Sequence, residues 1–571
     1  MARSRRSQAL LQFGLFCGIL LFVNILASAF FTHFDLTEEK RFTLTQPTRE
    51  LLRNLDDQVY VEVLLGGDYP AGIRRLQQAT REMLDDFRGI NGYIDYEFTD
   101  PTLGTPEQVA EKEKAFREMG ISAVTVAMNK DGQQTFKAAF PFAILHYKNR
   151  QTVVRLAENP TPDTDPEVVM NNAVSTLEYR LASAIKKIQT NVRSIILFTQ
   201  GHGELDELQT ADLEVALRSS YDVDRINLDS IVTIEPEQCR LLVVAKPVTA
   251  FSEKDKFKID QYVMAGGRVL WLVDRMNATL DSMRYTRAFV PIDYPLNIED
   301  QLFKYGVRIQ PDLVLDWDCA KIELVTGQYG NSPQFTAVPW VYFPTVSPAS
   351  DHPIVKSLDR VFLRFCSSID TIRTKTPVKK TYLLRTSARS RLQFSPVQLG
   401  FDFLKAPDNP ENYNKGPQTV GVLLEGIFPS NYENRVSEEM LAGLKQLGLE
   451  YRDKSVPTSM IVISDGDVAL NPIQDREKKK FGPLGFNPYV QRRSELVVYA
   501  NKDLLLNAIE YLIDPSGIIE ARTREVKLRK LDAVRPRAEK TQWQLFNIGV
   551  PLALLALFAL LFNWLRKKRF A

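Results

Sequence analysis

The stretch Arg193-Ser194-Ile195-Ile196-Leu197-Phe198-Thr199-Gln200-Gly201-His202-Gly203-Glu204 decides the fold of the central region. Its apolar first half is typical of a buried strand, and its glycine-rich second half is typical of a turn. Similar apolar runs occur at 241–245, 268–273 and 460–463. Apolar strands that alternate with helical patterns indicate a largely parallel, doubly wound α/β sheet.

Helical patterns follow most of these runs. They are expected near 206–219, from Ser252 as a cap to Met264, and over 503–513. Residues 311–426 break the alternation with short β-like runs and many prolines. We interpret this stretch as a β-rich insertion, with a subdomain of its own as one possibility.

The N-terminal part of the polar region has a different order of elements, which predicts a small α/β layer domain of the thioredoxin-like type. A Cys-x-x-Cys motif is absent from the sequence, so a thioredoxin-like redox role is excluded. A helix over 167–189 is expected to connect this domain to the central one. The expected elements are a helix capped by Thr45, strands at 59–65, 93–98, 123–128, 134–147 and 151–156, and helices at 71–89 and 106–119.

Both ends of the chain carry a long uncharged apolar segment, Ala9 to Phe31 and Leu545 to Leu565. At about 1.5 Å per residue, each is long enough to cross a hydrocarbon core of roughly 30 Å as a helix. Arginines precede the first segment, and Arg566 to Arg569 follow the second. The positive-inside tendency therefore predicts cytoplasmic termini and a large periplasmic region between the spans.

Two features offer other interpretations of this topology. Ala27-Ser28-Ala29 resembles a signal-peptidase site, and cleavage at Ala29 would turn the first span into a signal peptide. We favour an uncleaved anchor because the apolar run is longer than a usual signal core. The stretch Arg522 to Lys540 holds eight basic residues just before the second span and, taken alone, would mark that side as cytoplasmic. It is also suited to lie on anionic headgroups.

These patterns predict an ordered set of segments along the chain. They are a cytoplasmic N-terminus at 1–8, a span at 9–31, the small domain at 35–160, a connecting helix at 165–190, the doubly wound domain at 191–515, a basic juxtamembrane segment at 516–544, a span at 545–565 and a cytoplasmic C-terminus at 566–571.

Composition and missing motifs exclude several classes of function. The net charge of +2 over 571 residues gives no reason to expect nucleic acid as a partner. Four widely spaced cysteines indicate neither a disulfide framework nor a zinc site. The sequence lacks a phosphate-binding Gly-x-x-x-x-Gly-Lys-Ser/Thr loop and a Gly-x-Ser-x-Gly or Gly-x-Cys-x-Gly nucleophile turn. We therefore predict a protein that is not an enzyme, with no catalytic residues, cofactor or metal.

The best candidates for a ligand site are Gly201, His202, Gly203 and Glu204, which follow a strand where open α/β sheets usually bind ligands. Asp206 stands where a dinucleotide motif requires its third glycine, so a nucleotide cofactor is not expected. The alternative is that the glycines only form a tight turn.

Asp465 and Asp467 follow another strand and are expected to reach the same crevice. Asp-Gly is also ordinary turn chemistry, so a purely structural role is the competing interpretation of this pair.

Several segments carry a resemblance to a known family: 35–45, 55–63, 67–72, 75–77, 82–87, 201–204, 266–269 and the last span. In these segments the sequence resembles the GldG family of gliding-motility ABC-transporter auxiliary proteins of Bacteroidetes. The resemblance implies a subunit, often described as substrate-binding, that works with a separate ATPase and a separate permease. We expect the doubly wound central domain to be flavodoxin- or amidotransferase-like. The resemblance implies a central domain similar to intraflagellar-transport-type and glutamine-amidotransferase-like α/β folds, without the catalytic cysteine.

The leading hypothesis is an auxiliary subunit of an ABC transporter in the bacterial inner membrane, in contact with the lipid bilayer, a multi-span permease and a cytoplasmic ATPase. Gly549, Ala553 and Ala556 would allow close helix packing with the permease. The runner-up is a periplasmic glycan- or peptide-binding protein, or a hydrolase-like enzyme, that uses a crevice of His202, Glu204 and Asp465. A structural scaffold is the third reading.

Overall fold

The structure is a computed structural model of the full chain. It describes residues 13–24, 43–130, 133–157, 166–190, 193–285, 288–330, 332–356, 358–401, 409–446, 448–490, 497–514, 516–523 and 539–570. Two compact units divide the chain, Met1–Glu525 and Val526–Ala571.

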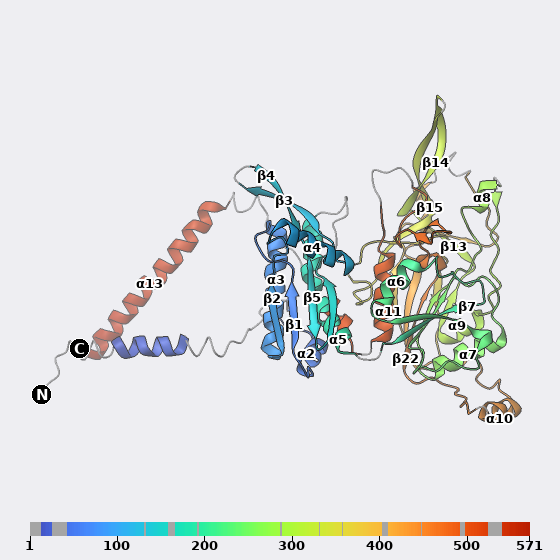
Figure 1. The fold of residues 1–571 in the computed structure, drawn as a ribbon, viewed down its shortest axis with the longest axis horizontal. Coiled ribbons are helices and arrows are strands. Elements are labelled where there is room, and N and C mark those ends of the chain that lie inside the picture. The colour runs from blue at the N-terminus through green and yellow to red at the C-terminus, as the bar shows by residue number, and fades with distance from the viewer. Residues whose placement is uncertain are drawn as a thin grey trace. The chain divides into compact units, whose positions relative to one another are not determined.

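The N-terminal part of the first unit contains a four-stranded sheet of order β2-β1-β5-β6 (Figure 1). β1 and β2 are parallel, whereas β5 is antiparallel to both β1 and β6. This order is compatible with the predicted thioredoxin-like layer. The elements are α2 (Gln46–Arg53), β1 (Val59–Val63), α3 (Ala71–Ile90), β2 (Ile94–Phe98), α4 (Pro106–Glu118), β3 (Val124–Lys130), β4 (Gln133–Ala139), β5 (Phe142–Tyr147), β6 (Arg150–Arg155) and α5 (Pro166–Gln189).

A large mixed sheet forms the centre of the same unit. Strands β8, β7, β9, β10 and β22 lie side by side in this order, and all their pairings are parallel. This part confirms the α/β class and the parallel pairing expected from the apolar runs. Its elements are β7 (Ile195–Gln200), α6 (Ala211–Arg218), β8 (Asp222–Asn227), β9 (Leu241–Ala245), α7 (Glu253–Met264), β10 (Val269–Leu272), α9 (Glu299–Tyr305), β22 (Thr458–Ile463) and α11 (Asn501–Ile513).

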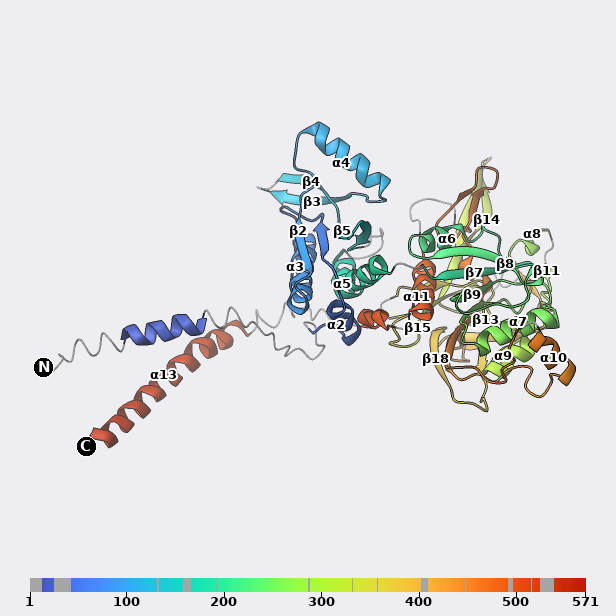
Figure 2. The same ribbon diagram turned by 60° about the horizontal axis from the view of Figure 1, so that its bottom comes forward.

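Helices cover both faces of these parallel strands (Figure 2). Side chains of α6 and α11 pack with alternate strand residues such as Val243 and Leu270 in one core. Side chains of α7 and α9 pack with the intervening residues, such as Val244 and Trp271, in another. Because successive residues of a strand point to opposite faces, apolar runs without alternation are needed to fill both cores.

The stretch expected to be a β-rich insertion is β-rich, but part of it extends the central sheet. β21 (Thr419–Gly426) pairs antiparallel with β22, and β18 (Val378–Arg385), β15 (Ser332–Pro348) and β14 (Cys319–Tyr329) continue the sheet. The sheet is therefore mixed rather than parallel throughout. Other residues of this stretch, among them Trp340 and Phe343, form a separate aromatic-rich core with β13 (Asp312–Asp316).

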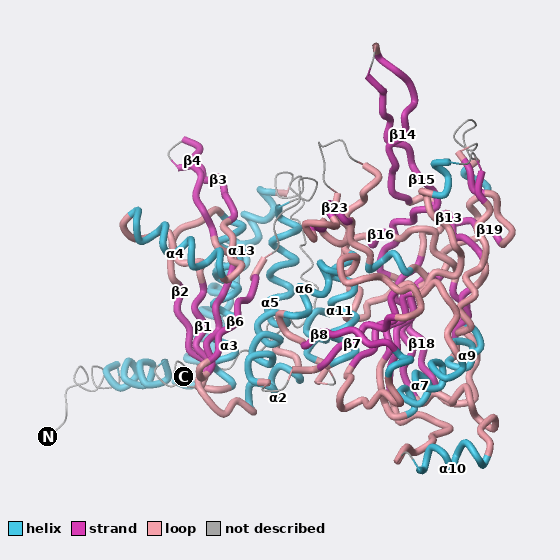
Figure 3. Tube along the Cα trace, turned by 45° about the vertical axis from the view of Figure 1, so that its right-hand side comes forward, coloured by secondary structure: helices cyan, strands magenta, loops and turns pink. Residues whose placement is uncertain are grey.

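β14 and β15 extend away from the rest of the sheet as a two-stranded ribbon (Figures 1 and 3). Residues 324–350 contain no charged side chain. Near its tip the ribbon exposes Val325 and Phe335, which are 62% and 38% accessible.

The second unit contains α13 (Lys540–Phe570), an exposed apolar helix. Among the described residues it is the one helix long and apolar enough to cross a membrane, by length and composition alone. In the first unit, a shorter apolar helix covers Phe13–Asn24. The rest of the predicted first span, the Ala29 cleavage site, residues 1–8 and most of the basic segment before α13 lie outside the described residues.

Candidate functional site

The predicted site residues lie in two turns at one edge of the central sheet. Gly201 to Glu204 follow β7, and Asp465 and Asp467 follow β22. Since β7, β9, β10 and β22 are parallel, their carboxyl ends share this edge. This edge is where open α/β sheets usually bind ligands.

The two glycines of the first turn have left-handed backbone conformations. Gly201 has a φ of 114° and Gly203 a φ of 74°. A Cβ atom at Gly203 would lie 2.3 Å from Cγ2 of Val248, so the turn packs closely against the segment after β9. Conformation and packing both require glycine at this position.

His202 is buried within the first turn, with 6% of the residue accessible. Its ring stacks on Phe251, with ring centroids 3.8 Å apart and an interplanar angle of 10°. Nδ1 lies 3.4 Å from Oε1 of Glu204, and Nε2 lies 3.4 Å from Oδ2 of Asp255. Burial acts to lower the pKa of His202, but the two carboxylates outweigh it and hold the pKa above its ordinary value.

Glu204 folds back on its own turn. Its Oε2 accepts a hydrogen bond of 2.6 Å from the backbone N–H of His202. Burial acts to raise the pKa of Glu204, but hydrogen bonds from His202 bring it below the usual value. The contact of His202 with Asp255 links the turn to the start of α7, and the hydrogen bond to Glu204 holds the backbone of the turn, so these contacts favour the structural interpretation. A ligand-binding role for the four residues stays a prediction.

The second turn is held by buried ion pairs. Nζ of Lys246 lies 2.5 Å from Oδ1 of Asp467 and 3.1 Å from Oδ2 of Asp274. Nη2 of Arg364 donates to the backbone carbonyl of Asp467 at 3.0 Å. The carboxylate of Asp465 accepts from the backbone N–H of Asp467 at 2.7 Å and from that of Arg364 at 2.5 Å.

Burial sets the protonation of this charge cluster, which we define as Lys246, Asp274, Arg364, Asp465 and Asp467. It raises the pKa of Asp465 well above its ordinary value, and the neighbouring carboxylates of Asp274 and Asp467 act in the same direction. Burial would also raise the pKa of Asp467, but the charges of Arg364 and Lys246 hold it below its ordinary value. Such a cluster is stable only while each buried charge keeps its partner.

One short segment contacts both turns. The backbone N–H groups of Val248 and Thr249 donate to the carbonyl of His202, at 2.9 and 3.0 Å. Two residues earlier, Lys246 reaches Asp467. The structure therefore places the two predicted turns along one edge, joined through residues 246–249.

Three members of the charge cluster, Lys246, Asp274 and Arg364, were not predicted from the sequence. Lys246 directly follows β9, and Asp274 lies two positions after β10, so their places after apolar strands were a usable signal. Arg364 lies in the β-rich stretch, and its sequence neighbourhood gave no such signal. In the described part of the chain, no group of three or more His, Cys, Asp or Glu side chains is placed to hold a metal ion.

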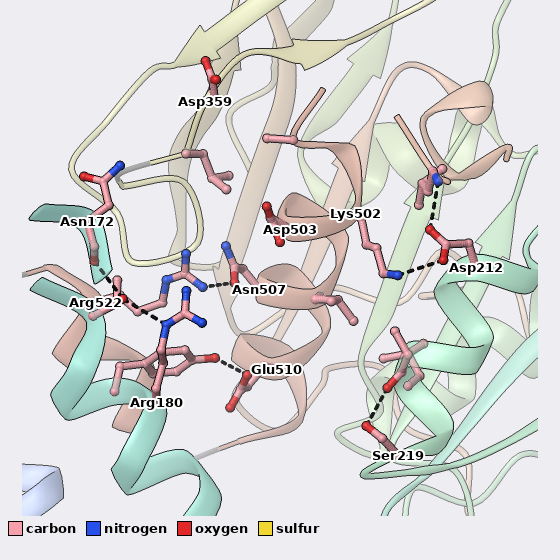
Figure 4. Close-up of a pocket in the computed structure, with 18 of the residues that line it drawn as sticks. Asn172, Arg180, Asp212, Ser219, Asp359, Lys502, Asp503, Asn507, Glu510 and Arg522 are labelled. Carbon is pink, nitrogen blue, oxygen red and sulfur yellow. Dashed lines mark hydrogen bonds and ion pairs between the residues drawn. The ribbon is translucent and has the colours of Figure 1, made fainter. Parts of the chain in front are cut away.

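A groove of about 940 Å³ lies elsewhere, between α5, α6 and α11 (Figure 4). Two pairs of its labelled side chains engage each other: Lys502 pairs with Asp212 at 2.8 Å, and Arg522 donates to Asn507. Glu510 accepts a hydrogen bond from Tyr179. None of the predicted site residues lines this groove.

The small residues predicted for helix packing lie on α13. Gly549, Ala553 and Ala556 are exposed, and a Cβ atom at Gly549 would meet nothing within 4 Å. Larger side chains therefore fit at Gly549 without a clash inside the chain.

Residues 193–508 match the family described as "ABC-type uncharacterized transport system", and this region is more than half of the chain. The chain belongs to this family. Proteins of ABC-type transport systems act with permease and ATPase components, so membership assigns the chain an auxiliary role in such a system. Residues 38–146 match a further family, a domain of unknown function named DUF7088.

Among solved structures, this member of the ABC-type transport family is similar to one titled "mmIFT52 N-terminal domain", with 12% identity and a TM-score of 0.30. The match covers 56% of this chain and 97% of the other. A search of curated proteins found no match.

Proposed function

We propose that the chain is a non-enzymatic auxiliary subunit, of the substrate-binding type, of an ABC transporter that supports gliding motility or secretion of surface components. The observation that carries the proposal is the family match over 193–508. Two features support it: the apolar helix α13, which is suited to contact a membrane-embedded permease, and the lack of a phosphate-binding loop in the sequence. Without such a loop, the chain depends on a separate ATPase to use ATP.

The partner test is extraction in mild detergent. We expect the chain to co-purify with a multi-span permease and a cytoplasmic ATPase encoded by the same cell. Replacing Gly549, Ala553 and Ala556 together by leucine removes the surface that allows close helix approach. The amount of co-purified permease should therefore fall at least tenfold, while the melting temperature of the large unit should be unchanged.

The control makes conservative apolar substitutions on another face of α13. Leu554→Ile with Phe558→Leu should retain the permease at the level of the unmodified chain. Repeated purification of the chain alone, with permease and ATPase both expressed, would contradict the transporter proposal.

We also propose an inner-membrane protein with two spans and a periplasmic large unit. Gln328, exposed near the tip of the β14–β15 ribbon, is a suitable reporter position. A membrane-impermeant maleimide should label Gln328→Cys in cells with a permeabilised outer membrane, and should label Lys567→Cys only after lysis. The unmodified chain gives the background of its four native cysteines.

The reverse labelling pattern would place the large unit in the cytoplasm. The basic stretch 522–540 would then be the cytoplasmic flank of α13.

A further inference from the structure

A second groove lies at the opposite, amino-terminal edge of the central sheet. It has a volume of about 620 Å³ and is lined by the end of α5, the residues after α6 and the residues just before β7 and β9. Among its lining residues, five are basic and two are acidic. The basic residues are Arg150, Lys186, Lys187, Arg193 and Arg240, and the acidic ones are Glu510 and Asp514.

The two carboxylates of this groove already have partners. Asp514 pairs with Lys186 and accepts from the backbone N–H of Ser516 at 2.8 Å. Glu510 accepts from Tyr179 and, at 2.7 Å, from Ser183. Glu510 also lies 3.8 Å from Nζ of Lys187. The two carboxylates therefore pair with the two lysines, and the three arginines that line the groove pair with neither.

The arginines have weak partners or none. Nη1 of Arg193 donates to the backbone carbonyl of Arg218 at 3.3 Å and lies 3.8 Å from the exposed carboxylate of Asp222, a pair of little strength in water. Arg150 donates only to backbone carbonyls at the end of α5, at 3.0 and 3.3 Å. Within the described ranges, the guanidinium of Arg240 has neither a hydrogen bond nor an ion pair.

A further arginine, Arg268, adds to the same positive field. It directly precedes β10, as Arg240 precedes β9, and these two strands are neighbours. Burial lowers the pKa of Arg268, and the positive charge of Arg240 lowers it further. The negative charge of Asp514 acts in the opposite direction but does not restore the ordinary pKa. Two half-buried arginines that repel each other therefore favour a bound anion.

We propose that this groove binds a phosphate group, held by the guanidinium groups of Arg193 and Arg240. Arginine is suited to this role because its planar donors match phosphate oxygens in pairs. The phosphate belongs either to a soluble ligand or to a lipid headgroup. This inference does not depend on the proposed transporter partners.

The first arm of the test uses the full-length chain in an uncharged detergent, with sodium pyrophosphate as the probe at constant ionic strength. A ligand of the folded state raises the melting temperature by mass action, so we expect a saturable rise. Arg193→Gln with Arg240→Gln should weaken the apparent affinity at least tenfold. Since these side chains have no strong partner, the melting temperature without pyrophosphate should not fall.

The matched control removes the same charge elsewhere. Arg117→Gln with Arg476→Gln changes two arginines that do not line the groove, and should bind pyrophosphate as the unmodified chain does. Absence of a saturable rise with the unmodified chain, or equal affinities of the two double variants, would overturn the proposal.

A second variant keeps the proposal testable if the Arg193→Gln, Arg240→Gln variant does not fold. Ser194 lines the groove, and the carbonyl of the next residue, Ile195, accepts from the backbone N–H of Arg240 at 2.9 Å. Ser194→Asp places a carboxylate beside the arginines. It should raise the melting temperature and weaken pyrophosphate binding at least tenfold, and undiminished binding would overturn the proposal.

The second arm identifies the source of the phosphate. The chain is reconstituted in nanodiscs of phosphatidylcholine alone or mixed with phosphatidylglycerol. A higher melting temperature in the mixed discs, lost in the Arg193→Gln, Arg240→Gln variant, supports a lipid headgroup. Equal melting temperatures, together with a pyrophosphate response, support a soluble ligand. A lipid effect that survives in the variant, without a pyrophosphate response, would overturn the proposal.

Discussion

Lys246→Met should lower the free energy of unfolding by about 3–5 kcal/mol, because it removes the one cation that contacts both of two buried carboxylates. Lys246 contacts both Asp467 and Asp274, and its side chain is 14% accessible. Burial acts to lower the pKa of Lys246, but the two carboxylates outweigh it and raise the pKa, so the lysine is charged at neutral pH. Chemical denaturation of the full chain, followed by tryptophan fluorescence, measures the loss.

The matched control for Lys246→Met is a lysine substitution in an exposed ion pair with the same N–O distance. Nζ of Lys148 lies 3.1 Å from Oδ2 of Asp56, the same distance as between Lys246 and Asp274. Lys148→Met should leave the denaturation midpoint unchanged, since water screens an exposed pair. Equal losses of unfolding free energy from the two substitutions would show that burial does not determine how much the charge cluster contributes to stability.

His202→Ala combined with Glu204→Ala should cost about 2–4 kcal/mol of stability. The change removes a ring stacked on Phe251 and a carboxylate that holds the backbone of the turn. Thermal unfolding measures the loss, and Glu207→Ala, an exposed carboxylate shortly after the same turn, is the control and should have no effect.

This double substitution also separates the two interpretations of the turn. A large loss of stability supports the structural role of His202 and Glu204. An unchanged melting temperature with impaired function would instead support the ligand site, and with it the runner-up function of a glycan- or peptide-binding protein or hydrolase-like enzyme.

The parallel part of the central sheet could be predicted because its strands are buried on both faces. β9 begins and ends where the apolar run 241–245 does, and β10 and β22 differ from their predicted runs by only one or two residues at an end. α6 is shorter than the expected helix over 206–219. Asp206 and Gln209 exchange side-chain hydrogen bonds with each other's backbone N–H groups and form a turn before it.

The antiparallel half was harder to predict because its sequence contradicts the usual rules for strands. β15 contains Pro333, Pro339, Pro344 and Pro348, and proline normally argues against a long strand. Much of β15 belongs to a two-stranded ribbon, where one edge needs no ladder partner. Similarly, the expected strand 134–147 is divided around Phe140 and Pro141 into β4 and β5.

The candidate site was predictable in position but not in its contacts. The place of Gly201 to Glu204 after β7 follows from the order of apolar runs. The stacking of His202 on Phe251 and the reach of Lys246 to Asp467 depend on packing between segments far apart in the sequence. Periodicity carries no information about such pairs, and the groove of Arg193 and Arg240 was missed for the same reason.

The position of β22 in the sheet has a consequence for biosynthesis. β10 ends at Leu272, but its parallel neighbour β22 begins only at Thr458. A growing chain that has not yet reached Thr458 therefore has an apolar strand with an unpaired edge at the centre of its future sheet. Such long-range pairings form slowly, and until β22 pairs with it the exposed edge of β10 is a site for aggregation. The central sheet can close only after nearly all of the large unit has left the ribosome, shortly before α13 emerges.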